Sequence, residues 1–287
     1  MFSIAVKFLT QRVVAATTSK ADEVEWPIHP ARLFMAMAAA HYESCPTDDE
    51  RKALEWLEAL SPPTIHAPVV AMRETQTVFV PVNDKLPDPA RRVRQPRQFP
   101  SAFVGDSPAR FCWEDDIPDD LRDALSSLAS KVVRLGHSSS LVQCWVEIDE
   151  QRSPDQKTEV WKCVPAATGN SRRLRTTSPG LLKTLERDMN EAAISEYADL
   201  KLLSRDGDTA EKKKAKKELK DRFPNDLPVS RRPSIGTSKI YTLERAAERQ
   251  AEIIRTVFDP VPIVMTKIDG RTMGLESTLL MLSLIHI

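Results

Sequence analysis

The chain has 287 residues, of which 41% are hydrophobic and 29% are charged, a composition typical of a globular protein with one large domain or two ordinary ones. No apolar run approaches the roughly 18 residues that a membrane span needs, and the N-terminus has no signal-peptide core, so we expect a cytoplasmic protein without membrane contact. The formal net charge is zero, which excludes a uniformly basic nucleic-acid binder but leaves room for a basic face.

The N-terminal segment predicts one strand and two helices. Residues 2–9 alternate between apolar and polar positions with the period of a strand. Pro30 suits the first turn of a helix whose apolar stripe ends at Pro46. Thr47 and Glu50 have the spacing of a capping box, which places a second helix directly after the first.

The next segment predicts short strands and one further helix. Between residues 64 and 113, β-type runs are separated by proline-rich turns, and Pro81 marks its run as an edge strand or a bulge. Pro118 opens an amphipathic helix, and Gly136 stands where a helix C-cap glycine is expected. Residues 142–148 alternate again and form a closing strand.

This order of elements, β, α, β, β, α, β, predicts an α+β fold of the ferredoxin-like kind, which is the RRM-like or split βαβ arrangement. We therefore expect residues 1–150 to form one domain, with the first and last strands side by side in the middle of its sheet. This order of elements covers residues 1–150 and makes no prediction for the rest of the chain.

The second half predicts a charged insertion and the start of another domain. Residues 151–255 are polar and helical where they are periodic, and five lysines within 212–217 indicate a solvated helix, with RNA contact as the alternative. The β pattern resumes in residues 256–281, which we expect to be the first strand and helix start of a second ferredoxin-like domain. The last segment, 282–287, matches translated sequencing-adapter read-through, and a genuine apolar tail is the alternative.

The sequence predicts no metal and no cofactor. Four cysteines are scattered without a CxxC pair or a histidine partner at zinc spacing, so buried thiols are the favoured interpretation. No Walker loop, no GxGxxG motif and no carboxylate cluster with metal spacing occurs.

The stretch RLGHSSSLV, residues 134–142, sets a histidine beside three serines in a turn. Backbone N–H groups and hydroxyls in such a turn suit phosphate oxygens, and a plain capping turn whose serines bind local backbone groups is the alternative. Catalysis by the histidine is the minority interpretation, because no GxSxG elbow surrounds it and no partner acid is at a recognisable offset. The candidate residues are Gly136, His137, Ser138, Ser139 and Ser140.

The run ARRVRQPRQFPSAF, residues 90–103, combines four arginines with two phenylalanines. Such an extended, irregular segment can follow a nucleic-acid strand, with guanidiniums on phosphates and rings beneath bases, while a solvated loop with buried aromatics is the alternative. Two further candidates lie at the first helix, one a helix-entry histidine and the other an arginine that can meet an anion. The candidate RNA contacts are Arg91, Arg92, Arg94, Arg97, Phe99, His29 and Arg32.

Two motifs occur in order, EWPIHPARLF at 25–34 and RLGHSSSLV at 134–142, with ALEWLEAL and VPVND between them. On these motifs the chain, from Met1 to about Met281, resembles the type I-G (formerly I-U) CRISPR-associated proteins of the RAMP superfamily, the Cas-five/Cas-six fusion or Csb-two family. In that family, a subunit that grips the 5′ handle of CRISPR RNA is fused to a repeat-cleaving endoribonuclease.

The resemblance implies tandem ferredoxin-like domains and membership of a Cascade-type effector complex in antiviral defence, with CRISPR RNA and the other subunits as partners. It also implies that the full protein is a metal-independent endoribonuclease, in which a base helps the 2′-OH attack the adjacent phosphate and leaves a cyclic phosphate. The nuclease half is expected to be largely missing, so its catalytic residues are unassigned. Two alternatives remain open: cleavage of RNA by this fragment through His137, and a protein-only scaffold subunit.

Overall fold

The computed structural model describes residues 1–17, 20–81, 91–148, 157–229 and 236–245. These residues form antiparallel sheets and helices, so the prediction of an α+β protein is confirmed. None of the helices in these ranges is both long and apolar enough to cross a bilayer. The predicted start of a second domain and the predicted adapter segment lie outside the described residues.

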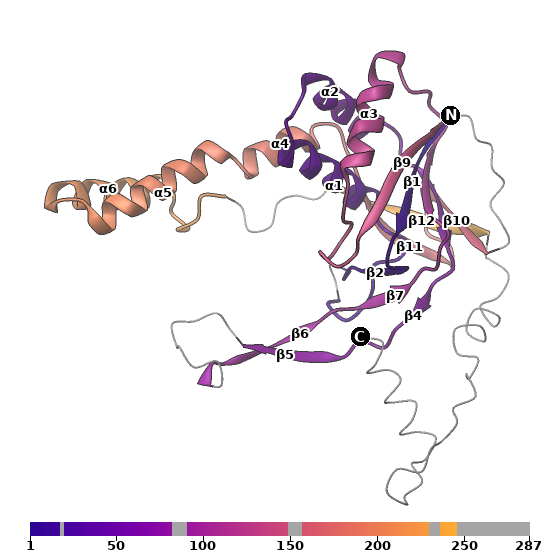
Figure 1. Ribbon diagram of the computed structural model, residues 1–287, viewed down its shortest axis with the longest axis horizontal. Helices are drawn as coiled ribbons and strands as arrows, with labels where there is room; N and C mark the ends of the chain where they lie inside the picture. The colour runs from indigo at the N-terminus through magenta and orange to yellow at the C-terminus, as the bar shows by residue number, and fades with distance from the viewer. Residues whose placement is uncertain (18–19, 82–90, 149–156, 230–235, 246–287) are drawn as a thin grey trace, which may run out of the picture. The chain divides into compact units, whose positions relative to one another are not determined.

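A seven-stranded antiparallel sheet carries most of the strands (Figure 1). Its strand order is β11-β12-β10-β3-β8-β1-β9, so both halves of the described chain contribute to it. The strands are β1 (Phe2–Phe8), β3 (Thr64–Pro68), β8 (Ala109–Trp113), β9 (Val142–Ile148), β10 (Thr158–Val164), β11 (Ser171–Thr176) and β12 (Thr237–Arg245).

The four strands from the N-terminal part follow the predicted chain order. β1 pairs antiparallel with both β8 and β9, and β3 pairs antiparallel with β8. The first and last of these strands are therefore side by side, as predicted. β9, however, lies at the edge of the seven-stranded sheet and not in its middle, because β1 is its one partner among the described strands. The strands after residue 150 extend the opposite edge, beyond β3.

Helices α1 (Pro30–Glu43), α2 (Asp48–Ala59) and α3 (Asp119–Lys131) lie together beside β1 and β9 (Figure 1). The alternation expected in β1 is real, and its inward side chains join one hydrophobic cluster with those of the helices. Burying these side chains is the main stabilising term, at about 25 cal/mol per Å² of apolar area. The cluster includes Phe2, Ile4, Val6 and Phe8 of β1, Leu33, Phe34 and Met37 of α1, and Leu121, Leu125 and Leu128 of α3.

The predicted capping box of α2 is only half formed. Thr47 accepts a hydrogen bond from the Glu50 backbone N–H at 3.3 Å, as expected of an N-cap. The Glu50 carboxylate binds elsewhere: it lies 3.1 Å from His41 Nδ1 and accepts hydrogen bonds from Ser127 at 3.1 Å and from Lys131 at 2.5 Å. This buried carboxylate therefore connects all three helices.

The segment after residue 150 contains strands that the sequence did not predict. Helices α4 (Leu181–Asp188), α5 (Glu191–Asp206) and α6 (Thr209–Arg222) agree with the helical expectation, but β10, β11 and β12 join the main sheet, with β10 pairing with β3. β11 and β12 are rich in Arg, Lys and Thr and bury few side chains, among them Leu174 and Tyr241. β10 buries the adjacent Val160 and Trp161, so none of the three strands shows a clear apolar alternation. The sheet therefore continues across the predicted domain boundary.

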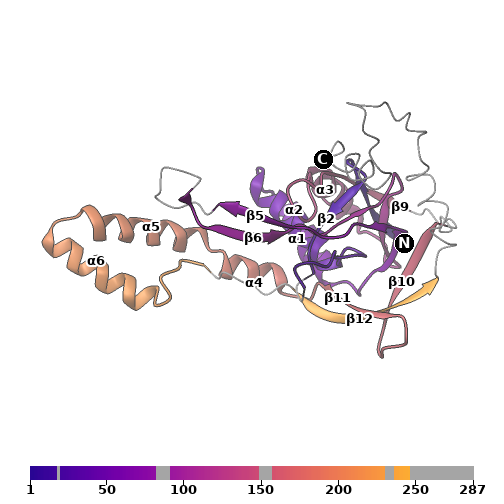
Figure 2. The ribbon, with the colours of Figure 1, turned by 90° about the horizontal axis from the view of Figure 1, so that it is seen from below.

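Two small sheets complete the strands. β2 (Arg12–Val14), β7 (Ser101–Phe103) and β4 (Ala71–Met72) form a three-stranded sheet in that order. Among the described strands, β5 (Thr77–Pro81) pairs with β6 (Arg94–Gln98) alone. The β5–β6 ribbon extends away from the main sheet in both views (Figures 1 and 2), and every residue in its two strands is exposed. The prediction that Pro81 marks an edge strand is confirmed.

The cysteines are free thiols in different environments. Cys144 is buried and Cys112 and Cys163 are half-buried, but Cys45 is exposed, so the expectation of buried thiols is wrong for Cys45. Burial raises the pKa of Cys144 to about 12 and that of Cys112 to about 11.

A buried carboxylate joins β11 to the segment before α1. Glu25, which has no exposed surface, accepts two hydrogen bonds of 2.7 Å from Arg32 and one of 3.1 Å from Arg175. The His29 backbone N–H donates to the same carboxylate at 3.2 Å. Burial alone raises the pKa of Glu25, but the hydrogen bond and charge of Arg32, together with the hydrogen bond from the His29 backbone, lower it.

We expect Glu25→Gln to lower the free energy of unfolding by about 3 kcal/mol or more, because it leaves the cations of Arg32 and Arg175 without their buried counter-charge. Chemical denaturation measures the loss. Since the folded-state pKa of Glu25 is lowered, its contribution is present above the unfolded pKa of about 4.3 and is lost as the pH falls through the folded pKa.

The matched control is Glu244→Gln, which breaks an exposed 2.9 Å pair with Lys162. This control should cost no more than about 1 kcal/mol. Equal losses from the two substitutions would contradict a structural role for the Glu25 cluster.

Candidate nucleic-acid interface

The loop at 136–140 is fixed to the backbone of β2. The His137 N–H donates to the Val14 carbonyl at 2.8 Å. The Ser140 hydroxyl accepts from the Val14 N–H at 2.7 Å and lies 3.3 Å from the Val14 carbonyl. The sequence predicted that Gly136 is a helix C-cap, and this is wrong: α3 ends at Lys131, and Gly136 lies in the loop that follows. Ser140 is fully buried, so its hydroxyl holds β2 and does not face solvent.

The remaining serines of the loop lie on the surface. The Ser140 N–H donates to the His137 carbonyl at 2.9 Å, which closes the turn. His137 Nδ1 accepts from the Ser139 N–H at 3.2 Å and is 2.8 Å from the Ser139 hydroxyl, so the other ring nitrogen is the one available to a ligand. Within the described part of the chain, the exposed Ser138 hydroxyl has no partner.

The β5–β6 ribbon places its two arginines on opposite faces. Arg94 is opposite Pro81 and shares a face with Phe79, while Arg97 is opposite Val78 on the other face. All five side chains are exposed, and Phe79 retains 64% of its surface. Part of the arginine run is therefore a regular strand, and not the irregular segment that the sequence predicted. Each face of the ribbon offers a guanidinium beside apolar surface.

The ribbon and the loop meet at Phe99. This residue follows β6, is 46% exposed, and its ring lies edge-on to the His137 imidazole, with 5.3 Å between ring centroids. The contact follows from the pairing of β2, because Val14 lies opposite Ser101 of β7 and also binds the loop. Two segments that are far apart in the sequence are thus brought to one surface.

The other candidate arginines and His29 lie in different surroundings. Arg91 is exposed and Arg92 half-buried at the start of the arginine run. Arg32 and His29 belong to the buried Glu25 cluster, where Arg175 donates to His29 Nδ1 at 3.3 Å. Burial lowers the pKa of His29 to about 4 despite the raising effect of Glu25, so the ring is neutral near pH 7. The side chains of Arg32 and His29 therefore contact other residues of the Glu25 cluster.

The geometry suits binding more directly than acid–base chemistry. His137 pairs with Ser139 and Phe99, and none of the ion pairs among the described residues includes His137. The described residues also hold no group of three or more His, Cys, Asp and Glu side chains that could ligate a metal. An exposed ring pair and a free hydroxyl, with one guanidinium on each face of the neighbouring ribbon, can contact bases and phosphates.

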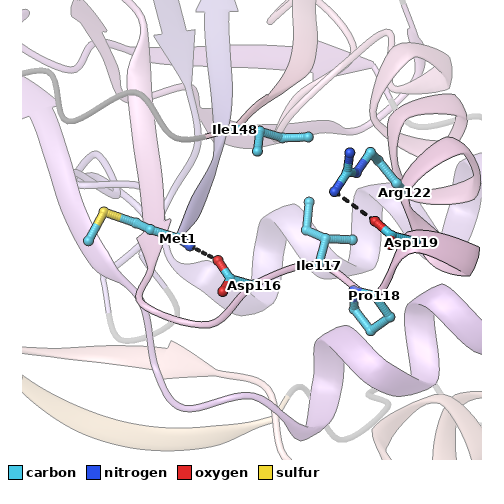
Figure 3. Close-up of a pocket in the computed structure, with 7 residues that line it drawn as sticks. All are labelled: Met1, Asp116, Ile117, Pro118, Asp119, Arg122 and Ile148. Atoms are coloured by element: carbon cyan, nitrogen blue, oxygen red, sulfur yellow. Dashed lines mark hydrogen bonds and ion pairs between the residues drawn. The ribbon is translucent and has the colours of Figure 1, made fainter.

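A pocket elsewhere in the molecule lies at the ends of β1 and β9 (Figure 3). Its charged groups already pair with one another, since the N-terminal amine binds Asp116 and Arg122 lies 2.9 Å from Asp119. None of the predicted site residues lines it. The lining residues are Met1, Asp116, Ile117, Pro118, Asp119, Arg122 and Ile148.

Comparison with known proteins adds little to this geometry. No protein-family model matches the chain, and no curated protein matches its sequence. Among solved structures, the chain is similar to the crystal structure of a CRISPR protein from Archaeoglobus fulgidus, with 11% identity and a TM-score of 0.28 over 60% of this chain and 67% of that one. A similarity of this size identifies neither a shared fold nor a shared function.

Sequence reasoning missed Val14, which fixes the loop, and the apolar residues of β5 that accompany the arginines. Val14 acts through its backbone, which leaves no signature in the sequence. Phe79 and Val78 were visible as part of a β-type run, and their exposure became apparent only from the pairing of β5 with β6 alone.

We expect Gly136→Ala to lower the free energy of unfolding by about 1–3 kcal/mol. Gly136 has a φ of +98°, and a Cβ added to it would lie 2.7 Å from the Val14 carbonyl oxygen. Chemical denaturation measures the loss, which should exceed the loss from either of two control variants.

The controls separate backbone strain from crowding. Gly169→Ala meets no atom within 4 Å and should be near neutral, while Gly180→Ala also meets none but has a φ of +85° and reports strain alone. A loss from Gly136→Ala no larger than that from Gly180→Ala would show that the close approach to Val14 contributes nothing.

Proposed function

We propose that the chain binds a single RNA strand on the surface formed by Phe99, the exposed loop residues Gly136–Ser139 and the β5–β6 ribbon. The observation that carries the proposal is the 5.3 Å ring contact between Phe99 and His137, which joins the ribbon to the loop. We call these residues the RNA surface.

The chemistry of this surface matches a single strand better than a small anion. Residues 91–98 contain four arginines and no acidic residue, and guanidiniums bind phosphate oxygens with two parallel hydrogen bonds. The exposed ring of Phe99 can stack on an unpaired base, a contact worth about 1–3 kcal/mol. The Ser138 hydroxyl and the free ring nitrogen of His137 can add polar contacts to the sugar-phosphate backbone of the RNA.

Within this proposal, the chain is the CRISPR RNA subunit of a type I-G Cascade-type complex and grips the 5′ handle. The support is the resemblance of its two motifs, EWPIHPARLF and RLGHSSSLV, and the strand order β9-β1-β8-β3 with helices in two connections, which is the order of a ferredoxin-like domain. The second motif forms the loop of the RNA surface. The fusion to a repeat-cleaving endoribonuclease rests on the resemblance alone.

We expect Arg94→Ala combined with Arg97→Ala to weaken binding of single-stranded RNA and to flatten its salt dependence. Each lost phosphate contact should reduce the slope of log K against log salt by about 0.7. Fluorescence anisotropy titrations with a labelled repeat RNA at several salt concentrations measure both effects.

The matched control is Arg122→Ala with Arg187→Ala, which removes the same charge from exposed positions on α3 and α4. An unchanged slope in the ribbon variant would exclude the ribbon as an RNA contact. Absence of RNA binding by the unmodified chain, together with binding of partner subunits, would instead support the protein-only scaffold.

A further inference from the structure

The helical hairpin of α5 and α6 is a separate basic element. It has its own small core of Leu200, Ala215 and Leu219, against which Tyr197 and Phe223 pack with their rings 5.2 Å apart. Both views show the hairpin extending beyond α4, away from the main sheet (Figures 1 and 2). It therefore presents a surface that the RNA surface does not include.

Side-chain interactions hold both ends of α6 and its contact with α5. Asp208 and Glu211 form a complete capping box at the start of α6. Near the other end, Arg222 pairs with Glu196 of α5. Side chains on the outer face of α6 are thus carried on a helix whose position is set by α5.

Four lysines form one stripe on that outer face. Lys213, Lys216, Lys217 and Lys220 have the spacing i, i+3, i+4, i+7, which places them on a single side of the helix. That side is opposite Ala215, which faces α5. All four are exposed, and among the described residues none of them forms an ion pair. We call these four residues the lysine stripe.

The charge of α6 is not balanced within the helix. Thr209–Arg222 contains seven basic and three acidic residues, for a net charge of +4 in a chain whose total is zero. Glu211 is used in the capping box, and Glu218 lies off the stripe by the helical spacing. Asp221, four residues after Lys217, is the one acidic residue of α6 at the edge of the stripe. A positive surface of this kind attracts a polyanion.

The side chains of the stripe favour one class of negatively charged partner over the others. A membrane helix needs exposed apolar side chains beside its basic ones, but Ala215 and Leu219 of α6 are buried against α5. The exposed apolar residues of the hairpin, Ile194, Leu202 and Leu203, belong to α5 and not to the lysine stripe. A protein partner would need an apolar or aromatic anchor, and a single strand would need rings for stacking; the stripe has only lysines. Lysines act as point charges on phosphates without reading bases.

We propose that the lysine stripe binds the sugar-phosphate backbone of a nucleic-acid duplex, either DNA or RNA. The stripe runs along about 10 Å of a straight helix, at a rise of about 1.5 Å per residue, which allows contact with successive phosphates of one strand. The interaction is independent of sequence. It makes the hairpin a second contact, outside the proposed function of the RNA surface.

The test compares the full chain with a variant in which Lys213, Lys216, Lys217 and Lys220 are all changed to Gln. Binding of short mixed-sequence duplex DNA, duplex RNA and single-stranded thymidine oligomer is measured by anisotropy at several salt concentrations. The variant should bind one or both duplexes at least about tenfold more weakly, with a salt slope flatter by about two to four units. The two duplex probes distinguish DNA from RNA, and loss with either supports the proposal.

Two controls make the result specific. Changing Lys52, Lys162, Lys183 and Lys239 to Gln removes the same charge from exposed positions outside the hairpin and should leave duplex binding nearly unchanged. The ribbon variant, Arg94→Ala with Arg97→Ala, should also retain duplex binding, so failure of the RNA surface and failure of this inference are distinguishable. Circular dichroism checks that the stripe variant keeps the helix content of the unmodified chain. Unchanged duplex binding in the stripe variant, or an equal loss for the single-stranded probe, would overturn the proposal.

Discussion

The backbone of Val14 is the point on which the proposed RNA surface depends. It pairs with Ser101 of β7 on one side and binds His137 and Ser140 of the loop by three contacts of 2.7–3.3 Å on the other. Because β7 begins two residues after Phe99, these contacts bring the base of the ribbon to the loop. The glycine at 136 is required by the same contact, since any side chain there would collide with the Val14 carbonyl. A short strand thus positions an aromatic ring, an imidazole and an arginine-bearing ribbon together.

Arginines in this protein divide into two groups according to whether a carboxylate accompanies them. Arg32 and Arg175 share the buried Glu25, where their charge stabilises the connection between β11 and the segment before α1. Arg94 and Arg97 lie on opposite faces of an exposed ribbon, and none of the ion pairs among the described residues includes them. The same guanidinium chemistry therefore supports the fold in one place and is available to a ligand in another. The neutral total charge conceals this separation.

Much of the fold could be predicted because apolar residues recur with the period of a strand or a helix in many of its elements. β1, the first three helices and β9 carry clear apolar stripes, and local rules located their starts. β10 to β12 escaped prediction because each buries few apolar side chains without a regular alternation, and their place in the sheet depends on pairing with distant strands. For the site, the sequence pointed to the loop and the arginine run, but it could not show that Ser140, His29 and Arg32 bind inward, because burial depends on the packed neighbours. The contact between Phe99 and His137 likewise has no local signal.

The most direct test of the account is a double-mutant cycle for RNA binding between Phe99→Ala and His137→Ala. If the ribbon and the loop form one surface, each single change weakens binding, and the double change costs less than the sum by about 0.5–3 kcal/mol, because the two rings contact each other and share one ligand. Losses that add to within about 0.5 kcal/mol would show two independent contacts. No loss from either change would contradict the proposed surface altogether.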